Sequence, residues 1–114
     1  MRKVKGNTLC VIQKATSSKN KIGEAVNVWT DAASVSGVLS LQSGDSKYST
    51  FNAKIEESTH IFICDFDSSV FTLSDSNVRC IINGKMYDVL LIDNPDLLDI
   101  QLEIYLRLVG GQNG

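Results

Sequence analysis

The sequence predicts an all-β protein, a small antiparallel β-barrel of about six strands with one long extended loop at residues 42–58. Short runs rich in β-branched and aromatic residues recur along the chain, with turn residues between them. No segment shows a sustained apolar stripe at helical spacing. The 114 residues suit one compact domain, with a flexible N-terminal arm at 1–6 and a flexible tail at 110–114.

The first half of the chain holds three β-like runs. The first is "NTLCVIQKA", and the polar stretch "TSSKNKIG" joins it to the next as a hairpin loop that ends at Gly23. The following runs, "EAVNVWTD" and "SVSGVLSLQ", are rich in valine and are divided by a weakly structured stretch from Asp31 to Ser34. We therefore expect separate strands before and after this stretch.

The second half adds a buried strand, a hairpin and a last strand. "THIFICDF" is typical of a buried strand because apolar side chains lie on both of its faces. Asn83-Gly84 predicts a type I′ turn, in which both positions need positive φ, so residues 78–92 form a hairpin. Pro95 in "DNPD" marks a turn before "DIQLEIYLRLV", whose period-two alternation predicts a strand with one buried face.

Composition and charge narrow the functional class. The chain is 43% hydrophobic and 21% charged with a formal net charge of −2, as in ordinary globular proteins. No apolar run approaches the roughly 18 residues that would span a membrane, and no signal peptide is evident, so we expect a cytosolic protein with no membrane partner. Residues 1–23 hold six basic side chains and no acidic one, whereas residues 24–114 hold five basic and 13 acidic. A basic arm can bind nucleic acid or an acidic face on a protein.

The sequence indicates no cofactor and no metal site. Cys10, Cys64 and Cys80 lie far apart without a C-x-x-C pair, which predicts buried reduced thiols. His60 is the only histidine, so no histidine triad or multi-histidine metal site can be built. We expect a structural histidine that helps to hold the base of the long loop.

One stretch, "IFICDFDSSVFTL", suggests catalysis. Its strand and the following Asp65-Phe66-Asp67 resemble the opening motif of the haloacid-dehalogenase phosphatases, in which the first aspartate attacks phosphorus and the second transfers protons. Such an enzyme needs several strand-helix-strand units after the motif, and too few residues follow Asp65 to supply them. We therefore predict no catalytic residues and interpret the motif as the end of a barrel strand.

The polar segment 42–58 is expected to contact a partner. Loops longer than about 12–15 residues are uncommon in compact domains and are often functional. Extended as a hairpin, this segment would reach about 28 Å. Its aromatic side chains have little chance of a local core, which favours contact with another protein. The candidate residues for this contact are Ser43, Gly44, Asp45, Lys47, Tyr48, Phe51 and Lys54.

The order of several motifs resembles one family. From about residue 7 to residue 109 the motifs are Gly23, Trp29 in a strand, Gly37, Ser43-Gly44, Ser58-Thr59-His60, "NGKMYDV" and "IDNP". Together they resemble the small head-tail joining (head-closure) proteins of tailed bacteriophages. The resemblance implies a structural virion protein of the neck, located at the head-tail interface and assembled in the host cytoplasm.

The resemblance also implies partners. Copies would form a ring, twelve-fold in this picture, below the portal and adaptor proteins and would contact a tail-completion or tail-terminator protein. The ring would join head to tail and help to retain packaged DNA, which passes close by in the channel. The loop at 42–58 would point toward the channel or drape over an adjacent subunit.

One departure from the family pattern concerns charge. Where such proteins often carry a basic-aromatic-basic triplet, this sequence has Asp65-Phe66-Asp67, which favours an acidic patch facing a basic partner such as the N-terminal arm of the next subunit. Two alternatives stay open: another tail-completion or virion component, and an OB-like nucleic-acid-binding barrel. The latter needs a basic groove, whereas the barrel-forming part is acidic. The interface candidates are Arg2, Lys3, Lys5, Trp29, His60, Asp65 and Asp67.

Overall fold

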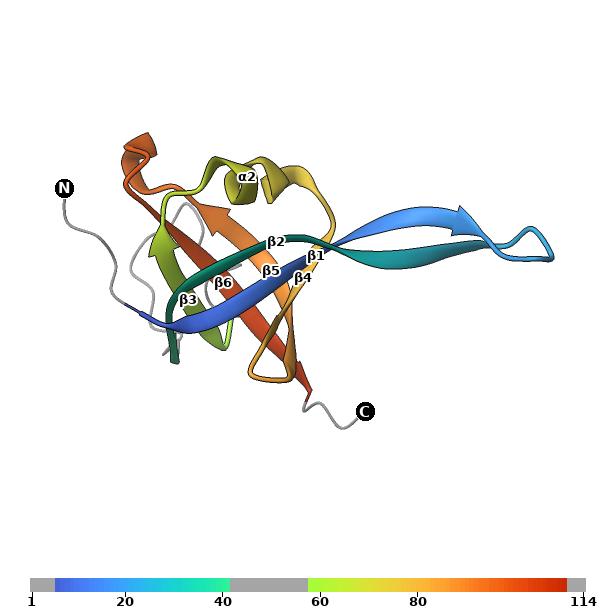
Figure 1. The fold of residues 1–114 in the computed structure, drawn as a ribbon, viewed down its shortest axis with the longest axis horizontal. Helices are drawn as coiled ribbons and strands as arrows, with labels where there is room; N and C mark the ends of the chain where they lie inside the picture. The colour runs from blue at the N-terminus through green and yellow to red at the C-terminus, as the bar shows by residue number, and fades with distance from the viewer. Residues whose placement is uncertain (1–5, 42–57, 111–114) are drawn as a thin grey trace.

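The computed structural model describes residues 6–41 and 58–110, which form a closed six-stranded barrel (Figure 1). Neighbouring strands are antiparallel, and their order around the barrel is β1-β2-β3-β6-β5-β4. The predicted all-β barrel is therefore confirmed. In chain order the elements are β1 (Thr8–Lys19), β2 (Ala25–Leu41), β3 (His60–Asp65), α2 (Ser68–Phe71), the 3-10 turn η1 (Thr72–Asp75), β4 (Val78–Ile82), β5 (Lys85–Asp93), the 3-10 turn η2 (Pro95–Leu97) and β6 (Gln101–Gly110).

The side chains that point into the barrel form one apolar core. On β6 the predicted alternation is present in part, because Leu102, Ile104 and Leu106 are fully buried and Glu103 is partly exposed, but Tyr105 is buried as well. Phe62 on the paired strand β3 is also fully buried and sits opposite Ile104. Burying one such side chain contributes about 1.5–3 kcal/mol. The core therefore holds the barrel as a rigid support for its surfaces.

The three cysteines belong to this core, as predicted. Cys10, Cys64 and Cys80 are free thiols, each no more than 1% exposed. Burial, with smaller effects of Cys10 and two nearby aspartates, raises the pKa of Cys64 to about 12. A hydrogen bond with Cys10 and burial also raise the pKa of Cys80. Cys64 and Cys80 therefore stay protonated at neutral pH, and a protonated thiol is a poor nucleophile.

The predicted β4–β5 hairpin is confirmed by its backbone. Asn83 and Gly84 have φ values of 53° and 78°. Positive φ at both central positions defines the type I′ turn, and its twist matches that of the strands on either side. The turn therefore fixes the register in which Ile82 pairs with Lys85.

The predicted break at Asp31–Ser34 is wrong, because β2 runs through it without interruption. The backbone pairs with β1 on both sides of the expected break, Ile12 with Ala33 and Gln13 with Asp31. Ala32 has no partner in this register and forms a β-bulge. A bulge increases the local twist of a strand pair without ending it, so the polar composition here marks a bend.

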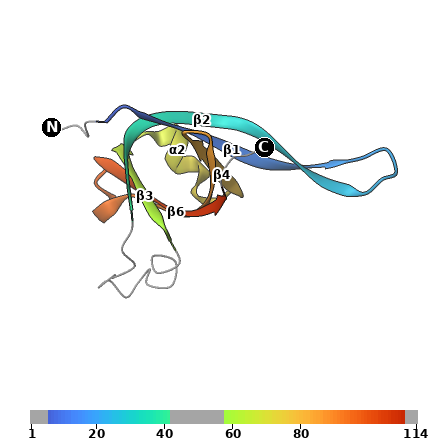
Figure 2. The same ribbon diagram turned by 90° about the horizontal axis from the view of Figure 1, so that it is seen from below.

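The hairpin of β1 and β2 continues beyond the barrel as an arm. β1 last pairs with β4 at Lys14, and residues 16–28, which we call the arm, project beyond that point (Figure 1, Figure 2). The molecule consequently measures 51 × 28 × 28 Å. The predicted hairpin loop is shorter than expected, because "TSSK" extends β1 to Lys19 and residues 20–24 make the turn. The hairpin was predicted, but its projection from the barrel was not.

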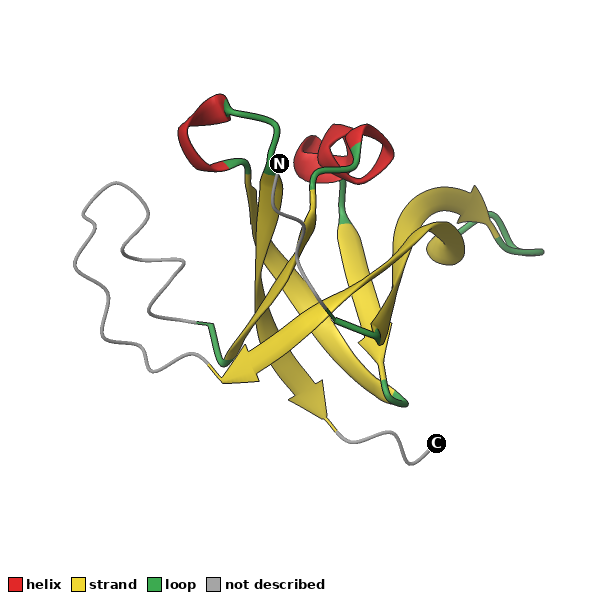
Figure 3. Cartoon of the chain, turned by 60° about the vertical axis from the view of Figure 1, so that its left-hand side comes forward, coloured by secondary structure: helices red, strands yellow, loops and turns green. Residues whose placement is uncertain are grey.

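Short helical turns cover one end of the barrel. α2 and η1 connect β3 to β4, and η2 connects β5 to β6 (Figure 3). The two connections start side by side, since Asp65 pairs with Gln101 and the Phe66 N–H donates to the Ile100 carbonyl at 3.0 Å. The turn at Pro95 was predicted from the sequence, whereas the helix after β3 was not. Elements of four residues or fewer are too short to produce a helical period.

Candidate interaction surfaces

The helical end of the barrel is strongly acidic. We call residues 65–77 and 93–100 the acidic cap, because they contain six aspartates and no lysine or arginine. Burial, followed by the charge of Asp96, raises the pKa of Asp93 above its usual value. A concentration of one charge sign produces a potential that attracts cationic partners and repels anionic ones. The aspartates of the cap are Asp65, Asp67, Asp75, Asp93, Asp96 and Asp99.

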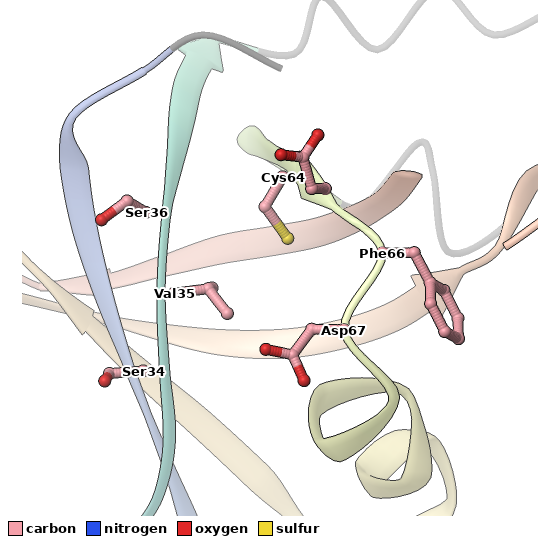
Figure 4. Close-up of a pocket in the computed structure, with 7 residues that line it drawn as sticks. Ser34, Val35, Ser36, Cys64, Phe66 and Asp67 are labelled. Atoms are coloured by element: carbon pink, nitrogen blue, oxygen red, sulfur yellow. The ribbon is translucent and has the colours of Figure 1, made fainter. Parts of the chain in front are cut away.

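Asp65 and Asp67 border a shallow pocket of about 210 Å³ between β2 and the end of β3. Figure 4 shows the Asp67 carboxylate directed toward β2 and the Phe66 ring directed away from the pocket. The Asp67 Oδ1 atom accepts hydrogen bonds from the Ser69 N–H at 2.9 Å and the Ser69 hydroxyl at 2.6 Å. Asp67 is thus the N-cap of α2.

This geometry answers the question raised by the phosphatase-like motif. β3 is antiparallel to both of its neighbours, β2 and β6, so the motif does not open a parallel sheet as it does in the phosphatases. Its second aspartate is engaged as a helix cap. Across the described ranges no group of three histidine, cysteine, aspartate or glutamate side chains is placed to hold a metal ion. The motif is the end of a strand followed by a capped helical turn.

The loop around η2, residues 94–100, exposes two leucines on a tightly held backbone. Leu97 and Leu98 are 77% and 60% exposed. The buried Asn94 side chain donates to the Asp99 Oδ1 atom at 2.8 Å and accepts from the Asp99 N–H at 3.1 Å. Asp96, Leu97 and Asp99 all have positive φ, which costs a residue with a side chain about 1–2 kcal/mol. These two hydrogen bonds, which we call the Asn94 clamp, offset part of this cost and hold the backbone that exposes both leucines.

Trp29, one of the predicted interface residues, lies at the base of the arm. The Arg79 guanidinium stacks over its ring, 4.3 Å from the centroid. Arg79 also donates to the Gln13 side chain at 2.8 Å, and Gln13 in turn donates to Asp31 at 2.9 Å. β4 is thereby joined through side chains to both strands of the arm at the point where they leave the barrel.

The tip of the arm is ordered by one asparagine. The Asn20 Oδ1 atom accepts from the Ile22 N–H at 3.1 Å and from the Glu24 N–H at 2.9 Å. Gly23 has φ of 87°, a conformation that favours glycine. Ile22, whose N–H donates one of these bonds, has a side chain that is 78% exposed. The arm thus ends in an apolar side chain on a fixed turn.

His60 lies at the opposite end of β3 from the acidic cap. Its ring packs edge-on against Tyr87 with 5.2 Å between ring centroids, and its Nδ1 atom is 2.9 Å from the Thr59 hydroxyl. The Thr59 hydroxyl accepts from the Leu108 N–H at 2.8 Å. Burial and then the charge of Lys85 lower the pKa of His60. A structural role at the point where β3 begins fits this environment.

The structure brings together only some of the predicted site residues. Asp65 and Asp67 share one pocket, whereas Trp29 and His60 lie on other parts of the barrel. The exposed leucines after Pro95 were not predicted from the sequence, although two leucines among aspartates were the available signal. The remaining candidates lie outside the described residues: Arg2, Lys3 and Lys5 near the N-terminus, and Ser43, Gly44, Asp45, Lys47, Tyr48, Phe51 and Lys54 in the segment 42–58.

With the geometry in place, comparison with known proteins identifies the family. The sequence matches the phage head completion protein family over residues 1–106. The chain belongs to this family. The head-tail joining family expected from the motif order is thereby confirmed. This head completion protein also resembles the solution structure of protein SF1141 from Shigella flexneri 2a, with a TM-score of 0.68 and 17% identity over 96% of this chain and 98% of the other.

Membership of the family fixes the broad role. This head completion protein is a structural component of a phage virion and works with other head and tail proteins, and its family is not a class of enzymes. The resemblance to SF1141 supports the barrel fold alone. No curated protein matches the sequence. Within the described ranges, the helices are too short to cross a membrane.

Proposed function

We propose that copies of this head completion protein form a ring below the portal and adaptor proteins, join head to tail and help to retain the packaged DNA. The family match, which extends over residues 1–106, carries the proposal. The described structure supports it, because a closed barrel around one apolar core carries a projecting arm and an acidic cap (Figure 1). A neck protein needs such surfaces to contact neighbours within a ring and partners above and below it.

The loop at residues 42–58 is assigned to the channel or to an adjacent subunit. Leu41 pairs with His60, so the two ends of this segment leave the barrel side by side. That site is at the end of β3 opposite the acidic cap. In the proposal, Tyr48 and Phe51 contact a protein partner there.

The acidic cap is assigned to a protein partner with a basic surface. The cap segments contain six aspartates and no lysine or arginine, and such a charge balance repels DNA phosphates, so we assign this end to a protein rather than to the packaged DNA. Asp65 and Asp67 belong to this protein-facing surface. The basic residues near the N-terminus, Arg2, Lys3 and Lys5, are one source of complementary charge.

The proposal is tested with phage heads assembled while the gene for this chain is interrupted. Such heads should lose DNA to added nuclease and fail to acquire tails, and purified protein should restore both DNA protection and infectious particles. Tailed, DNA-filled particles formed in the absence of the protein would refute the proposal. Tight binding of the isolated protein to DNA, with a steep loss of affinity as salt increases, would favour the nucleic-acid-binding alternative.

A further inference from the structure

Two apolar projections lie at opposite ends of the molecule. The arm ends in Ile22, and the η2 loop carries Leu97 and Leu98, three of the most exposed large apolar side chains in the described ranges. In Figure 1 the arm extends to the right and the orange-red η2 loop lies at the upper left, and Figure 2 also places them at opposite ends. Exposed apolar side chains on an ordered backbone are candidates for a protein contact where complementary charge lies beside them.

The charges around the two projections are complementary. Lys19 and Lys21 precede Ile22 on the arm, and Lys14 lies at its base. The acid of the arm, Glu24, accepts a hydrogen bond from the Asn20 side chain at 3.2 Å. The leucines of the η2 loop are instead surrounded by aspartates in a cap that contains no lysine or arginine. One end of the molecule thus carries an apolar tip with cations, and the other end carries an apolar loop with anions, so the two surfaces are complementary.

Both projections are held in place before any contact is made. The contacts of Arg79 with Trp29 and Gln13, which we call the Arg79 clamp, fix the base of the arm, and the hydrogen bonds to Asn20 fix its tip. The Asn94 clamp fixes the η2 loop. Groups that are already ordered lose little conformational entropy on binding, which favours association through small surfaces.

We propose that the arm of one copy docks on the η2 loop of the next copy. Ile22 then packs against Leu97 and Leu98, and the lysines of the arm face Asp96 and Asp99. The contact is heterologous because each copy offers a different surface at each end, and repetition of such a contact generates a ring when the rotation closes. The inference rests on the proposed ring and names the surfaces that build it.

The test is cysteine cross-linking between two variants of the full chain. One variant carries Ile22→Cys and the other Leu98→Cys, and the mixture is treated with a short bismaleimide at millimolar protein, where a contact with millimolar Kd is substantially occupied. The native thiols are buried and do not compete. Lys85→Cys, on the exposed β4–β5 hairpin, replaces Leu98→Cys in the control mixture.

The proposed contact predicts a specific heterodimer. The yield of Ile22→Cys joined to Leu98→Cys should exceed that of the Lys85→Cys control by about tenfold. Lys21→Glu in the arm variant, or added salt, should lower the yield toward the control. Equal yields in both mixtures, a dominant Ile22→Cys homodimer or the absence of any cross-link would each overturn the inference.

A second readout separates this inference from the proposed function. Ile22→Asp places a charge in the apolar contact and, because the side chain is exposed, should leave the barrel folded. It should fail to restore DNA-filled heads. If Ile22→Asp restores heads as well as the wild type, the arm contact is refuted while the head completion role stands.

Discussion

The free energy lost when the Arg79 clamp is removed can be worked out from its contacts. Arg79→Met keeps an apolar stem but removes the hydrogen bond to Gln13 and the stacking on Trp29. A hydrogen bond from a charged donor contributes about 1.5–3 kcal/mol and a partly exposed cation–π contact about 0.5–1 kcal/mol. Since Arg79 is partly exposed, we expect the lower ends of these ranges, about 2 kcal/mol. This free energy corresponds to about a 30-fold increase in opening of the arm's base.

Hydrogen exchange at one amide measures this opening directly. The Ala15 N–H donates to the Asn77 carbonyl at 3.0 Å, at the junction between arm and barrel, so its exchange rate should increase about 30-fold in Arg79→Met. Trp29, the single tryptophan, should also show increased local motion in fluorescence anisotropy.

Arg107→Met is the matched control. Arg107 is paired with Asp88 at 3.0 Å, and both side chains are 46% exposed, so its loss should cost about 0–1 kcal/mol and leave the Ala15 amide protected. If Arg79→Met and Arg107→Met exchange Ala15 at the same rate, the clamp does not hold the arm and the reasoning is refuted.

Three further predictions concern the barrel. Asn94→Ala removes two hydrogen bonds to Asp99 worth about 1 kcal/mol each, so Tm should fall by about 8 °C. Asn77→Ala is the control, because that side chain is exposed and its loss should change Tm little. Equal shifts of Tm in the two variants would contradict the role of the Asn94 clamp. Because burial lowers the pKa of His60, the unfolded chain binds the proton first, and stability in urea should decline as pH falls below 6.5; His60→Gln should remove this decline. The buried cysteines should react with a thiol reagent at neutral pH only after unfolding, and rapid labelling of the folded protein would show that the core is open.

Local chemistry made part of the fold predictable. Asn83-Gly84 specifies its turn through backbone conformation alone, and the alternation of β6 reports one buried face. The arm was not predictable in this way. Val26 and Val28 look like core residues of a strand, yet they are 38% and 42% exposed, because a strand pair has the same pattern whether or not a barrel lies beneath it.

The candidate site was predictable only where its residues are consecutive. Asp65 and Asp67 were expected to form an acidic patch, and the structure adds the aspartates of η2 because β3 ends beside the start of β6. The exposed leucines depend on the positive φ of Leu97, a conformation imposed by the hydrogen bonds between Asn94 and Asp99. Sequence patterns reflect the usual negative φ of leucine, so they do not predict a leucine that the surrounding structure holds at positive φ.

The route by which the barrel closes has a consequence for the order of folding. Gln13 on β1 and Arg79 on β4 are 66 residues apart in the sequence, whereas the β1–β2 and β4–β5 hairpins pair residues close along the chain. Pairing distant strands costs more loop-closure entropy, so the local hairpins should form first and the β1–β4 seam late. Arg79 reaches Trp29 only across that seam. A nascent chain therefore acquires a braced arm as one of its last folding events, and partly folded copies lack the rigid projection that an assembling neighbour would contact.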